Sequence, residues 1–248
     1  MPRVLALANQ KGGVGKTTTA VNLASGLALA GRDVLLIDLD PQANATSGLG
    51  LELHGDHRRH PLISPDEKAA LPSGRPNLTV VPSTPDLLRV EESLISVHDA
   101  AQRLGNFLVR QAKADYVIID CPPSLGLLTR NALAAANGII IPIQCEYYAM
   151  EGLTRILTEV EAVQTRANSN LSVAGILLTM YDPALELAME VAEEVASTFP
   201  QWVFSSVIPR DVTLSEASSF GQTIFEYAPR SRASMAYMEL TREVLDHE

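Results

Sequence analysis

A glycine-rich run near the amino terminus combines residue types that suit the binding of phosphate groups. The run is Lys11-Gly12-Gly13-Val14-Gly15-Lys16-Thr17-Thr18. Its glycines allow positive φ angles, so that backbone N–H groups can surround phosphate oxygens. A helix predicted to begin at Lys16 would add its positive dipole end at the same place. Lys16 can reach the β- and γ-phosphates and the Thr17 hydroxyl can bind Mg²⁺, so the run predicts a nucleoside triphosphate site.

Three aspartates follow strand-like apolar runs and could supply the other polar groups of such a site. Asp38 and Asp40 lie at and just beyond the end of the run Asp33–Asp38, and Asp120 ends the run Asp115–Asp120. Ligands of open α/β sheets bind at the carboxyl ends of the strands. A carboxylate there can hold Mg²⁺ directly or through water, and another can orient the attacking water. An aspartate at a strand end is often only a helix N-cap, but three of them beside a phosphate loop favour a functional site.

Strand-like and helix-like segments alternate along the chain and would position these residues. The strand-length runs are apolar nearly throughout, as expected for parallel strands covered on both faces. They are Val4–Ala8, Asp33–Asp38, Leu78–Pro82, Asp115–Asp120, Gly138–Ile143, Val173–Thr179 and Trp202–Pro209. The segments with helical periodicity are Lys16–Ala30, Pro85–Gln111, Leu125–Ala136, Met150–Ala167, Ala184–Phe199 and Ser231–His247. This alternation predicts one doubly wound α/β domain over residues 1–248, with a mainly parallel sheet flanked by helices.

Composition and charge exclude several classes of protein. The 248 residues are 46% hydrophobic and carry a formal net charge of −10, which excludes a disordered chain and a surface that is basic throughout. The two cysteines, Cys121 and Cys145, are too few for a disulfide framework and favour a reducing compartment. The sequence has no secretory signal pattern and no run of ~18 apolar residues, so we expect a cytoplasmic protein.

One polar segment, Gly50–Arg75, interrupts the alternation and is expected to be a surface loop. It contains His54, His57 and His60, which could suggest a metal site. No cysteine or carboxylate framework surrounds these histidines, so we do not expect them to bind a metal.

The motifs of nearly the whole chain resemble the ParA/Soj-type chromosome and plasmid partitioning ATPases, a P-loop NTPase family related to MinD. The phosphate loop departs from the general G-x-x-x-x-G-K-[ST] pattern, because Gln10 occupies the first glycine position and Lys11 follows it, as in the deviant Walker A motif of that family. The chain looks like the short form, without an N-terminal helix-turn-helix domain. The motifs are ANQKGGVGKTT, LLIDLDPQANATSGLG, YVIIDCPPSLGLLTRNAL, IPIQCEYYAMEGL, LLTMYD and VIPRDVTLSEASSFG.

The resemblance implies roles for individual residues. Lys11 would be the signature lysine that reaches the partner's nucleotide across a homodimer, where it would supply positive charge as an arginine finger does. Asp40 would support hydrolysis, and Asp38 and Asp120 would act as switch residues. The residues implied in nucleotide binding are Lys11, Gly12, Gly13, Val14, Gly15, Lys16, Thr17, Thr18, Pro209 and Asp211, and those in magnesium binding are Thr17, Asp38 and Asp120.

The resemblance also implies a function. ATP would close a sandwich dimer, the dimer would bind DNA non-specifically, and a ParB-like partner would stimulate a hydrolysis that is slow without it. Contacts of the γ-phosphate with the switch segments would give ATP its preference for the closed state. Such a protein would be cytoplasmic and nucleoid-associated.

Departures from the family pattern fall on the DNA side and at the base pocket. Ala184 and Thr213 occupy positions where similar sequences carry arginine, whereas Arg210, Arg230 and Arg232 remain as candidate DNA contacts. Fewer phosphate contacts predict weaker DNA binding with a flatter salt dependence. Asp211 stands where asparagine is usual, and an ionised aspartate can only accept hydrogen bonds, as from the amino group of adenine.

Three other functions share this type of phosphate loop. A MinD-like membrane ATPase would need a basic C-terminal helix, and Ser231–Glu248 is acidic. A NifH-like electron donor would need cysteines for an iron–sulfur cluster, and the sequence identifies no second substrate site for a kinase or an amide-forming synthetase. Because of the missing arginines, the alternative that stays open is a nucleotide-dependent scaffold that binds a protein partner and no DNA.

Overall fold

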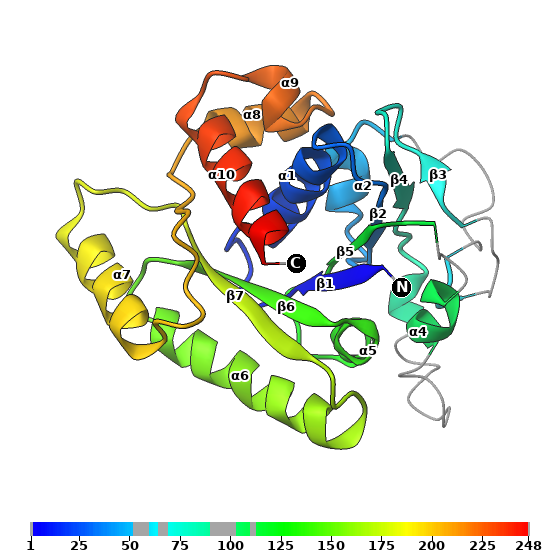
Figure 1. Cartoon of the computed structure of the whole chain (residues 1–248), viewed down its shortest axis with the longest axis horizontal. Coiled ribbons are helices and arrows are strands. Elements are labelled where there is room, and N and C mark those ends of the chain that lie inside the picture. Colours follow the sequence, from blue (N-terminus) through cyan, green and yellow to red (C-terminus); the bar gives the residue numbers. More distant parts are fainter. Residues whose placement is uncertain (1, 52–59, 64–68, 90–102, 110–112, 248) are drawn as a thin grey trace.

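The computed structural model describes residues 2–51, 60–63, 69–89, 103–109 and 113–247. Its centre is a seven-stranded sheet with the strand order β3-β4-β2-β5-β1-β6-β7 (Figure 1). All neighbouring strands are parallel except β3 and β4, which are antiparallel. The strands are β1 (Arg3–Leu7), β2 (Val34–Asp38), β3 (Leu71–Pro72), β4 (Leu78–Val81), β5 (Tyr116–Asp120), β6 (Gly138–Gln144) and β7 (Ser172–Thr179).

Helices cover both faces of this sheet, which confirms the doubly wound α/β fold (Figure 1). On one face lie α1 (Lys16–Leu29), α2 (Asn44–Gly48), α8 (Thr213–Ser219), α9 (Ile224–Tyr227) and α10 (Arg232–Asp246). On the other face lie α4 (Arg103–Leu108), α5 (Leu127–Ala135), α6 (Ala149–Arg166) and α7 (Glu186–Thr198). No helix of the described residues is long and apolar enough to span a bilayer.

Strand β1 shows why the strand sequences are apolar throughout. Leu5 and Leu7 are buried in the core that α1 and α10 cover, whereas Val4, Ala6 and Ala8 are buried in the core on the opposite face. Successive side chains of a strand point to opposite faces, so a central strand covered twice has no polar face.

The segment Trp202–Pro209 forms no continuous strand, so the prediction of a last strand is wrong. It makes only two isolated bridges, between Val203 and β7 and between Pro209 and the residue two positions beyond β7. Between them, the backbone N–H groups of Ser205 and Ser206 donate to the Glu243 carboxylate of α10, at 2.9 and 2.6 Å. Because these two N–H groups are bound to α10, they cannot extend a ladder with β7.

Two other segments differ from the sequence-based expectation. The predicted helix Pro85–Gln111 contains helical residues 87–89 and α4, and the rest of it lies largely outside the described residues. The short helices α2, α8 and α9 and the two-residue strand β3 are not predicted by periodicity, because four to seven residues complete at most two helical turns.

The expectation of a surface loop over Gly50–Arg75 is wrong at His60 and Leu62, whose side chains are buried. The His60 Nδ1 atom accepts a hydrogen bond from the Leu62 N–H at 3.2 Å, and burial lowers the pKa of His60 to about 3. This histidine is therefore a neutral core residue. His54 and His57 lie outside the described residues.

Candidate nucleotide site

The glycine-rich run forms a loop between β1 and α1. Gly13 and Gly15 adopt the left-handed conformation, with φ angles of 76° and 82°, and Gly15 directly precedes α1. A side chain would be strained at either residue, since L-residues rarely adopt such angles. The loop therefore has the location and the backbone freedom that the sequence predicts for phosphate binding, with the first N–H groups of α1 at its end.

Two polar residues outside the run hold this loop against the sheet. Asn9 donates from Nδ2 to the Pro142 carbonyl of β6 at 2.8 Å and accepts from the Lys11 N–H at 3.0 Å. Thr179, at the end of β7, has its Oγ1 within 2.9 Å of the Val14 carbonyl and 3.0 Å of the Ile143 carbonyl. Sequence reasoning missed both roles, although Asn9 and Thr179 lie within motifs noted above for their family resemblance.

Replacing Thr179 with valine should weaken the binding of Mg-ATP about 5- to 30-fold. The valine keeps the shape but removes the only hydroxyl donor, and leaving a buried acceptor unpaired costs about 1–2 kcal/mol. The measurement is a titration with a fluorescent ATP analogue. Thr179→Ser keeps the hydroxyl and should bind like the wild type; equal weakening in the serine and valine variants would contradict the role of the hydrogen bond.

Lys16 is buried at the start of α1, with 5% of its surface exposed. Its Nζ donates to the Lys11 carbonyl at 3.0 Å, which folds the side chain back over the loop. Burial lowers the pKa of Lys16, and the charges of Asp120 and Asp40 oppose that shift. These two carboxylates therefore lie near the amine, as expected where several strand ends meet at one phosphate loop.

Asp120 is a buried carboxylate that makes no hydrogen bond of regular geometry with the described residues, although the Thr17 hydroxyl lies near enough to lower its pKa. The residue is fully buried, and neither carboxylate oxygen has a hydrogen-bond partner in the described part of the chain. Burial and the nearby charge of Asp38 raise its pKa, while Thr17 and Lys16 act in the opposite direction. A buried carboxylate without hydrogen bonds is costly, and a bound cation would remove that cost.

Asp38 occupies the matching position on β2, in register with Asp120 on β5. Its carboxylate is fully engaged: Oδ1 accepts from the Asp40 N–H at 3.1 Å, and Oδ2 accepts from the N–H and the hydroxyl of Thr46 at 2.9 and 2.7 Å. Burial raises the pKa of Asp38 to about 6 in spite of these hydrogen bonds. The Asp38 carboxylate is thus hydrogen-bonded to α2, whereas the Asp120 carboxylate has no such hydrogen bonds from the described residues and could bind a cation.

The pKa of Asp38 predicts a pH dependence of stability in the protein without Mg²⁺. Between its ordinary value of 3.8 and about 6, the folded chain binds this proton more tightly than the unfolded chain. The contribution of Asp38 to the free energy of unfolding should therefore fall with rising pH across that window, by up to about 3 kcal/mol. Denaturant unfolding of wild type and Asp38→Asn from pH 4 to 7 measures the difference; a gap between the two that does not change with pH would contradict it.

Asp40 lies just past β2 and is almost completely buried, with 7% exposed. Its Oδ1 accepts from the Gln42 N–H at 2.9 Å, and its carbonyl accepts from the Ser83 hydroxyl. Ala43 takes the left-handed conformation, with φ of 54°, and turns the chain into α2. Within the described residues, the other carboxylate oxygen of Asp40 accepts no hydrogen bond.

Two neighbouring cavities lie beside the loop and α1. One, of about 380 Å³, is lined by Gly15, Thr18, Pro209 and Asp211, and the other, of about 390 Å³, includes Thr17 and parts of α2 and α8. Although burial acts to raise the pKa of Asp211, the hydroxyl and N–H of Thr213 and the Arg232 charge hold it below its usual value. Asp211 is therefore an ionised acceptor on the wall of a cavity large enough for a nucleobase.

The Lys11 side chain is partly exposed and pairs with Glu146. Its Nζ is 2.6 Å from the Glu146 Oε2, and both side chains are about half exposed, at 40% and 47%. Tyr147 and Tyr148 beside it are exposed and in edge-on contact, with ring centroids 5.1 Å apart. Lys11 thus lies on an open surface with two exposed aromatic rings.

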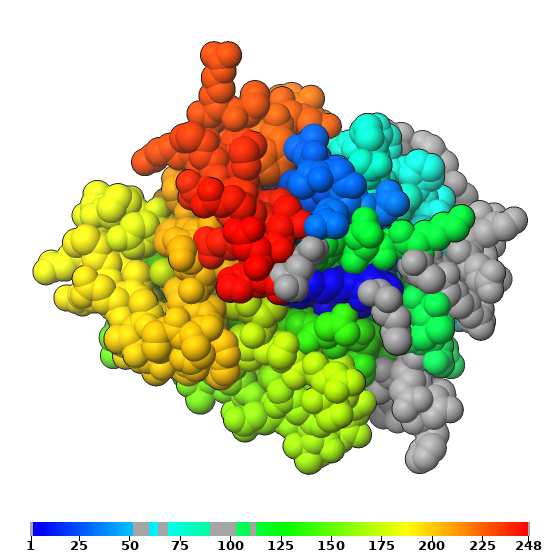
Figure 2. Space-filling model, viewed as in Figure 1, coloured from blue at the N-terminus to red at the C-terminus, as the bar shows by residue number. Residues whose placement is uncertain are grey.

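The candidate DNA contacts lie on the side of the protein that bears Asp211, because Arg210 lines the same cavity and the Arg232 charge acts on the Asp211 carboxylate. Arg210, Arg230 and Arg232 are exposed at the ends of the segments that bear α8, α9 and α10. The acidic helix α7 follows Ala184 and forms a separate part of the surface, yellow in Figure 2 where α8–α10 are orange to red. The structure therefore brings the phosphate-loop residues and the three aspartates together at one site, and Arg210 lines the neighbouring cavity with Asp211.

Comparison with known proteins agrees with this geometry. A family model described as "AAA domain" matches residues 2–173. The sporulation initiation inhibitor protein Soj of Bacillus subtilis is 47% identical over 250 residues, which cover 98% of each chain. The chromosome partitioning protein ParA of Myxococcus xanthus is 45% identical and covers 99% of this chain and 89% of its own.

The chain belongs to the Soj/ParA family of partitioning ATPases. A solved relative shares the fold: cobyrinic acid a,c-diamide synthase from Mycobacterium smegmatis, with bound ADP and magnesium, superposes with a TM-score of 0.86. It is 35% identical, and the match covers 100% of this chain and 95% of that one. The similarity to the partitioning proteins is higher than the similarity to the protein named as a synthase.

Proposed function

We propose that this protein is an ATP-hydrolysing switch that acts in chromosome or plasmid partitioning, with ATP and Mg²⁺ as its ligands. The observation that carries the proposal is the fully buried carboxylate of Asp120, which makes no regular hydrogen bond within the described residues and lies beside Lys16 and the phosphate loop. A relative at 35% identity binds ADP and magnesium on the same fold.

The residues present fit a magnesium ion. Asp120 and the Thr17 hydroxyl would hold it, and Asp38 would act indirectly, because Thr46 and the Asp40 N–H already bind its oxygens. No group of three His, Cys, Asp or Glu side chains among the described residues could form a complete metal cage. That matches magnesium sites completed by phosphate and water. Bound there, Mg²⁺ would neutralise charge on the phosphate oxygens.

In the proposed mechanism, this chain contributes one base and two lysines. Lys16 holds the β- and γ-phosphates, and Asp40 orients the attacking water with its free carboxylate oxygen. Lys11 leaves Glu146 and reaches the nucleotide of a second subunit, where its charge stabilises the transition state. Hydrolysis is slow until a ParB-like partner completes this arrangement.

The proposed output is non-specific DNA binding by the ATP-bound dimer, through Arg210, Arg230 and Arg232. The protein would act in the cytoplasm, on the nucleoid. Its acidic net charge restricts DNA contact to this local group, so affinity should be modest and should fall with salt.

The experiment is sedimentation of the full chain with Mg²⁺ and a non-hydrolysable ATP analogue or ADP, followed by retention on non-specific duplex DNA from 50 to 300 mM salt. We expect a dimer with the ATP analogue and a monomer with ADP. DNA should retain the dimer, and this retention should decrease as the salt concentration rises. A dimer that ignores DNA would overturn the DNA-binding proposal and favour a nucleotide-dependent protein-binding scaffold. A monomer in both nucleotides would contradict the switch itself.

A further inference from the structure

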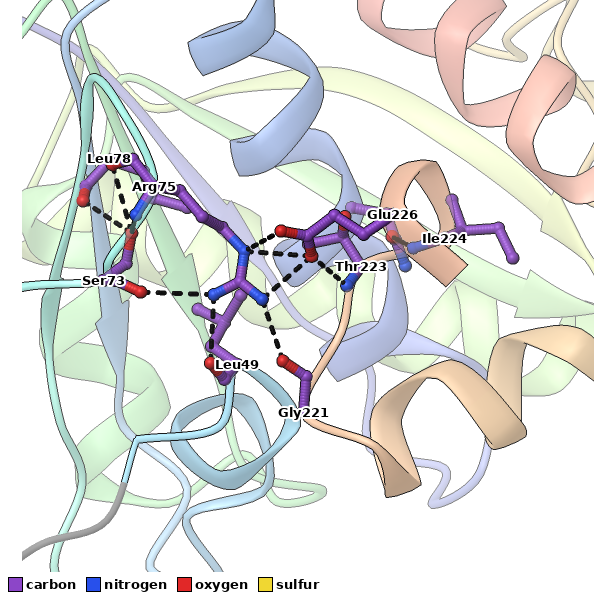
Figure 3. A network of polar contacts seen from close by, with 9 residues as sticks. Leu49, Ser73, Arg75, Leu78, Gly221, Thr223, Ile224 and Glu226 are labelled. Carbon is purple, nitrogen blue, oxygen red and sulfur yellow. Dashed lines mark hydrogen bonds and ion pairs between the residues drawn. The ribbon is translucent and has the colours of Figure 1, made fainter. Parts of the chain in front are cut away.

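Arg75 makes a set of hydrogen bonds that uses every donor of its guanidinium group (Figure 3). Its Nε is 2.9 and 3.1 Å from the two oxygens of Glu226, and its Nη2 is 2.9 Å from Oε2 of the same residue. Nη1 donates to the carbonyls of Leu49 and Ser73 at 3.0 and 3.3 Å, and Nη2 donates to the Gly221 carbonyl at 2.8 Å. Because five N–H groups are all bound, Arg75 has no donor left for an external phosphate.

These contacts join three segments that are distant in sequence. Leu49 follows α2, Ser73 lies in the turn between β3 and β4, and Gly221 lies between α8 and α9. Gly50 and Gly221 also touch directly, since a Cβ atom on Gly221 would lie 2.6 Å from the Gly50 Cα. The backbone after α2 is therefore packed against the backbone after α8, with Arg75 bound to both.

On one side, this junction leads to Asp38 and to the proposed catalytic residue Asp40. Thr46 of α2 donates its N–H and its hydroxyl to Asp38, and its hydroxyl oxygen accepts from the Ser83 N–H at 3.0 Å. The Ser83 hydroxyl in turn donates to the Asp40 carbonyl. A shift of Asp40 or Asp38 on binding a γ-phosphate would therefore move α2 and Leu49.

On the other side, the junction leads to the base cavity and the exposed arginines. Glu226 accepts from the Thr223 N–H at 2.7 Å and so caps α9 while it binds Arg75. Helix α8 begins at Thr213, whose N–H and hydroxyl donate to Asp211 at 3.0 and 2.7 Å. Arg230 lies three residues beyond the end of α9. A displacement of Gly221 and Glu226 would therefore also move the Asp211 side of the base cavity and the segment that carries Arg230.

We infer that Arg75 is a positioning residue that makes the α8–α9 segment follow the Asp38–Leu49 segment when the γ-phosphate is bound or lost. The inference rests on the proposed function, in which Asp38 and Asp40 respond to that phosphate. Through Arg75, the ATP state is transmitted to the surface that carries the candidate DNA contacts. Such coupling requires a structural element whose position depends on both the phosphate site and the α8–α9 surface. The Arg75–Glu226 pair is that element.

The test is hydrogen–deuterium exchange of the full chain with Mg²⁺ and either ADP or a non-hydrolysable ATP analogue. Both ligands carry adenine, so their difference reports the γ-phosphate together with the dimer that it is expected to close. In the wild type we expect the analogue to slow exchange, relative to ADP, at residues 44–50 and at residues 221–227. In Arg75→Gln the difference at 44–50 should persist, and the difference at 221–227 should fall at least threefold.

A purely structural role of Arg75 predicts another result, in which Arg75→Gln speeds exchange at 221–227 equally with both ligands and leaves their difference intact. That result would overturn the inference. Arg89→Gln is the matched control, because the Arg89 side chain is 87% exposed and makes one surface ion pair, with Asp86. Arg75→Lys keeps the charge but offers three donors in place of five, so it should give an intermediate loss.

If Arg75→Gln does not fold, Glu226→Gln tests the same coupling from the other side of the ion pair. The glutamine keeps an oxygen for the Thr223 N–H but removes the charge that pairs with Arg75, and it should also reduce the difference at 221–227. Failure of the proposed function has a different signature, namely no difference at 44–50 in the wild type, which would remove the inference as well. A wild-type difference at 44–50 with none at 221–227 would overturn the inference alone.

Discussion

Replacing Lys16 with alanine should weaken the binding of ATP by about 100-fold or more. The buried ammonium group would make charge-assisted hydrogen bonds to the β- and γ-phosphates, and each is worth about 1.5–3 kcal/mol. Nearby water cannot replace it, because Lys16 is 5% exposed and lies under the phosphate loop. The stability of the free protein should change much less, since burial of this charge already costs free energy, as the lowered pKa indicates.

A titration of the Lys16→Ala variant with a fluorescent ATP analogue and Mg²⁺ measures the effect, with the melting temperature of the free protein as a check on folding. Lys113→Ala removes an exposed lysine outside the site and should bind like the wild type. A folded Lys16→Ala protein with wild-type affinity would contradict the assignment of the phosphate loop.

The parts of the site that could be predicted from the sequence depend on local order along the chain. Gly13 and Gly15 lie between a strand and a helix that the sequence itself marks, and their positive φ angles follow from that turn. Asp38 and Asp120 end two parallel strands, and parallel strands end at the same edge of a sheet. No long-range information is needed for either prediction.

The parts that could not be predicted depend on contacts between residues far apart in sequence. Thr179 binds the carbonyl of Val14, 165 residues away, and Arg75 binds Glu226, 151 residues away. The strand expected at Trp202–Pro209 is interrupted because Ser205 and Ser206 bind Glu243, on a helix near the end of the chain. A polar residue in a turn gives no local sign of such a partner.

The structure also distinguishes two aspartates that the sequence treats alike. Asp38 and Asp120 occupy paired positions on β2 and β5, yet one accepts three hydrogen bonds and the other accepts none within the described chain. The difference arises from Thr46, which reaches back from α2 to Asp38. Asp120 therefore suits direct binding of a cation, and Asp38 suits a link between the metal site and α2.

Replacing Asp40 with alanine should leave ATP binding within about threefold of the wild type and reduce hydrolysis about 100-fold or more, which is the usual contribution of a general base. The phosphate contacts come from the loop and Lys16, which the substitution does not touch. With hydrolysis blocked and the Lys11 surface intact, Mg-ATP should hold the variant as a dimer, whereas the wild type should return to monomer as ATP is consumed. The Ser83 hydroxyl binds the Asp40 carbonyl, not its side chain, so the local backbone should persist.

Phosphate release and sedimentation over the same time course measure both effects in one sample. Asp86→Ala is the control, because this aspartate side chain is 45% exposed and makes a surface ion pair with Arg89, outside the nucleotide site. Wild-type hydrolysis by Asp40→Ala would remove Asp40 from the mechanism and leave the water to be oriented by another group. The variant could instead lose hydrolysis and remain a monomer. Asp40 would then remain the base, but bound ATP would not be sufficient to close the dimer.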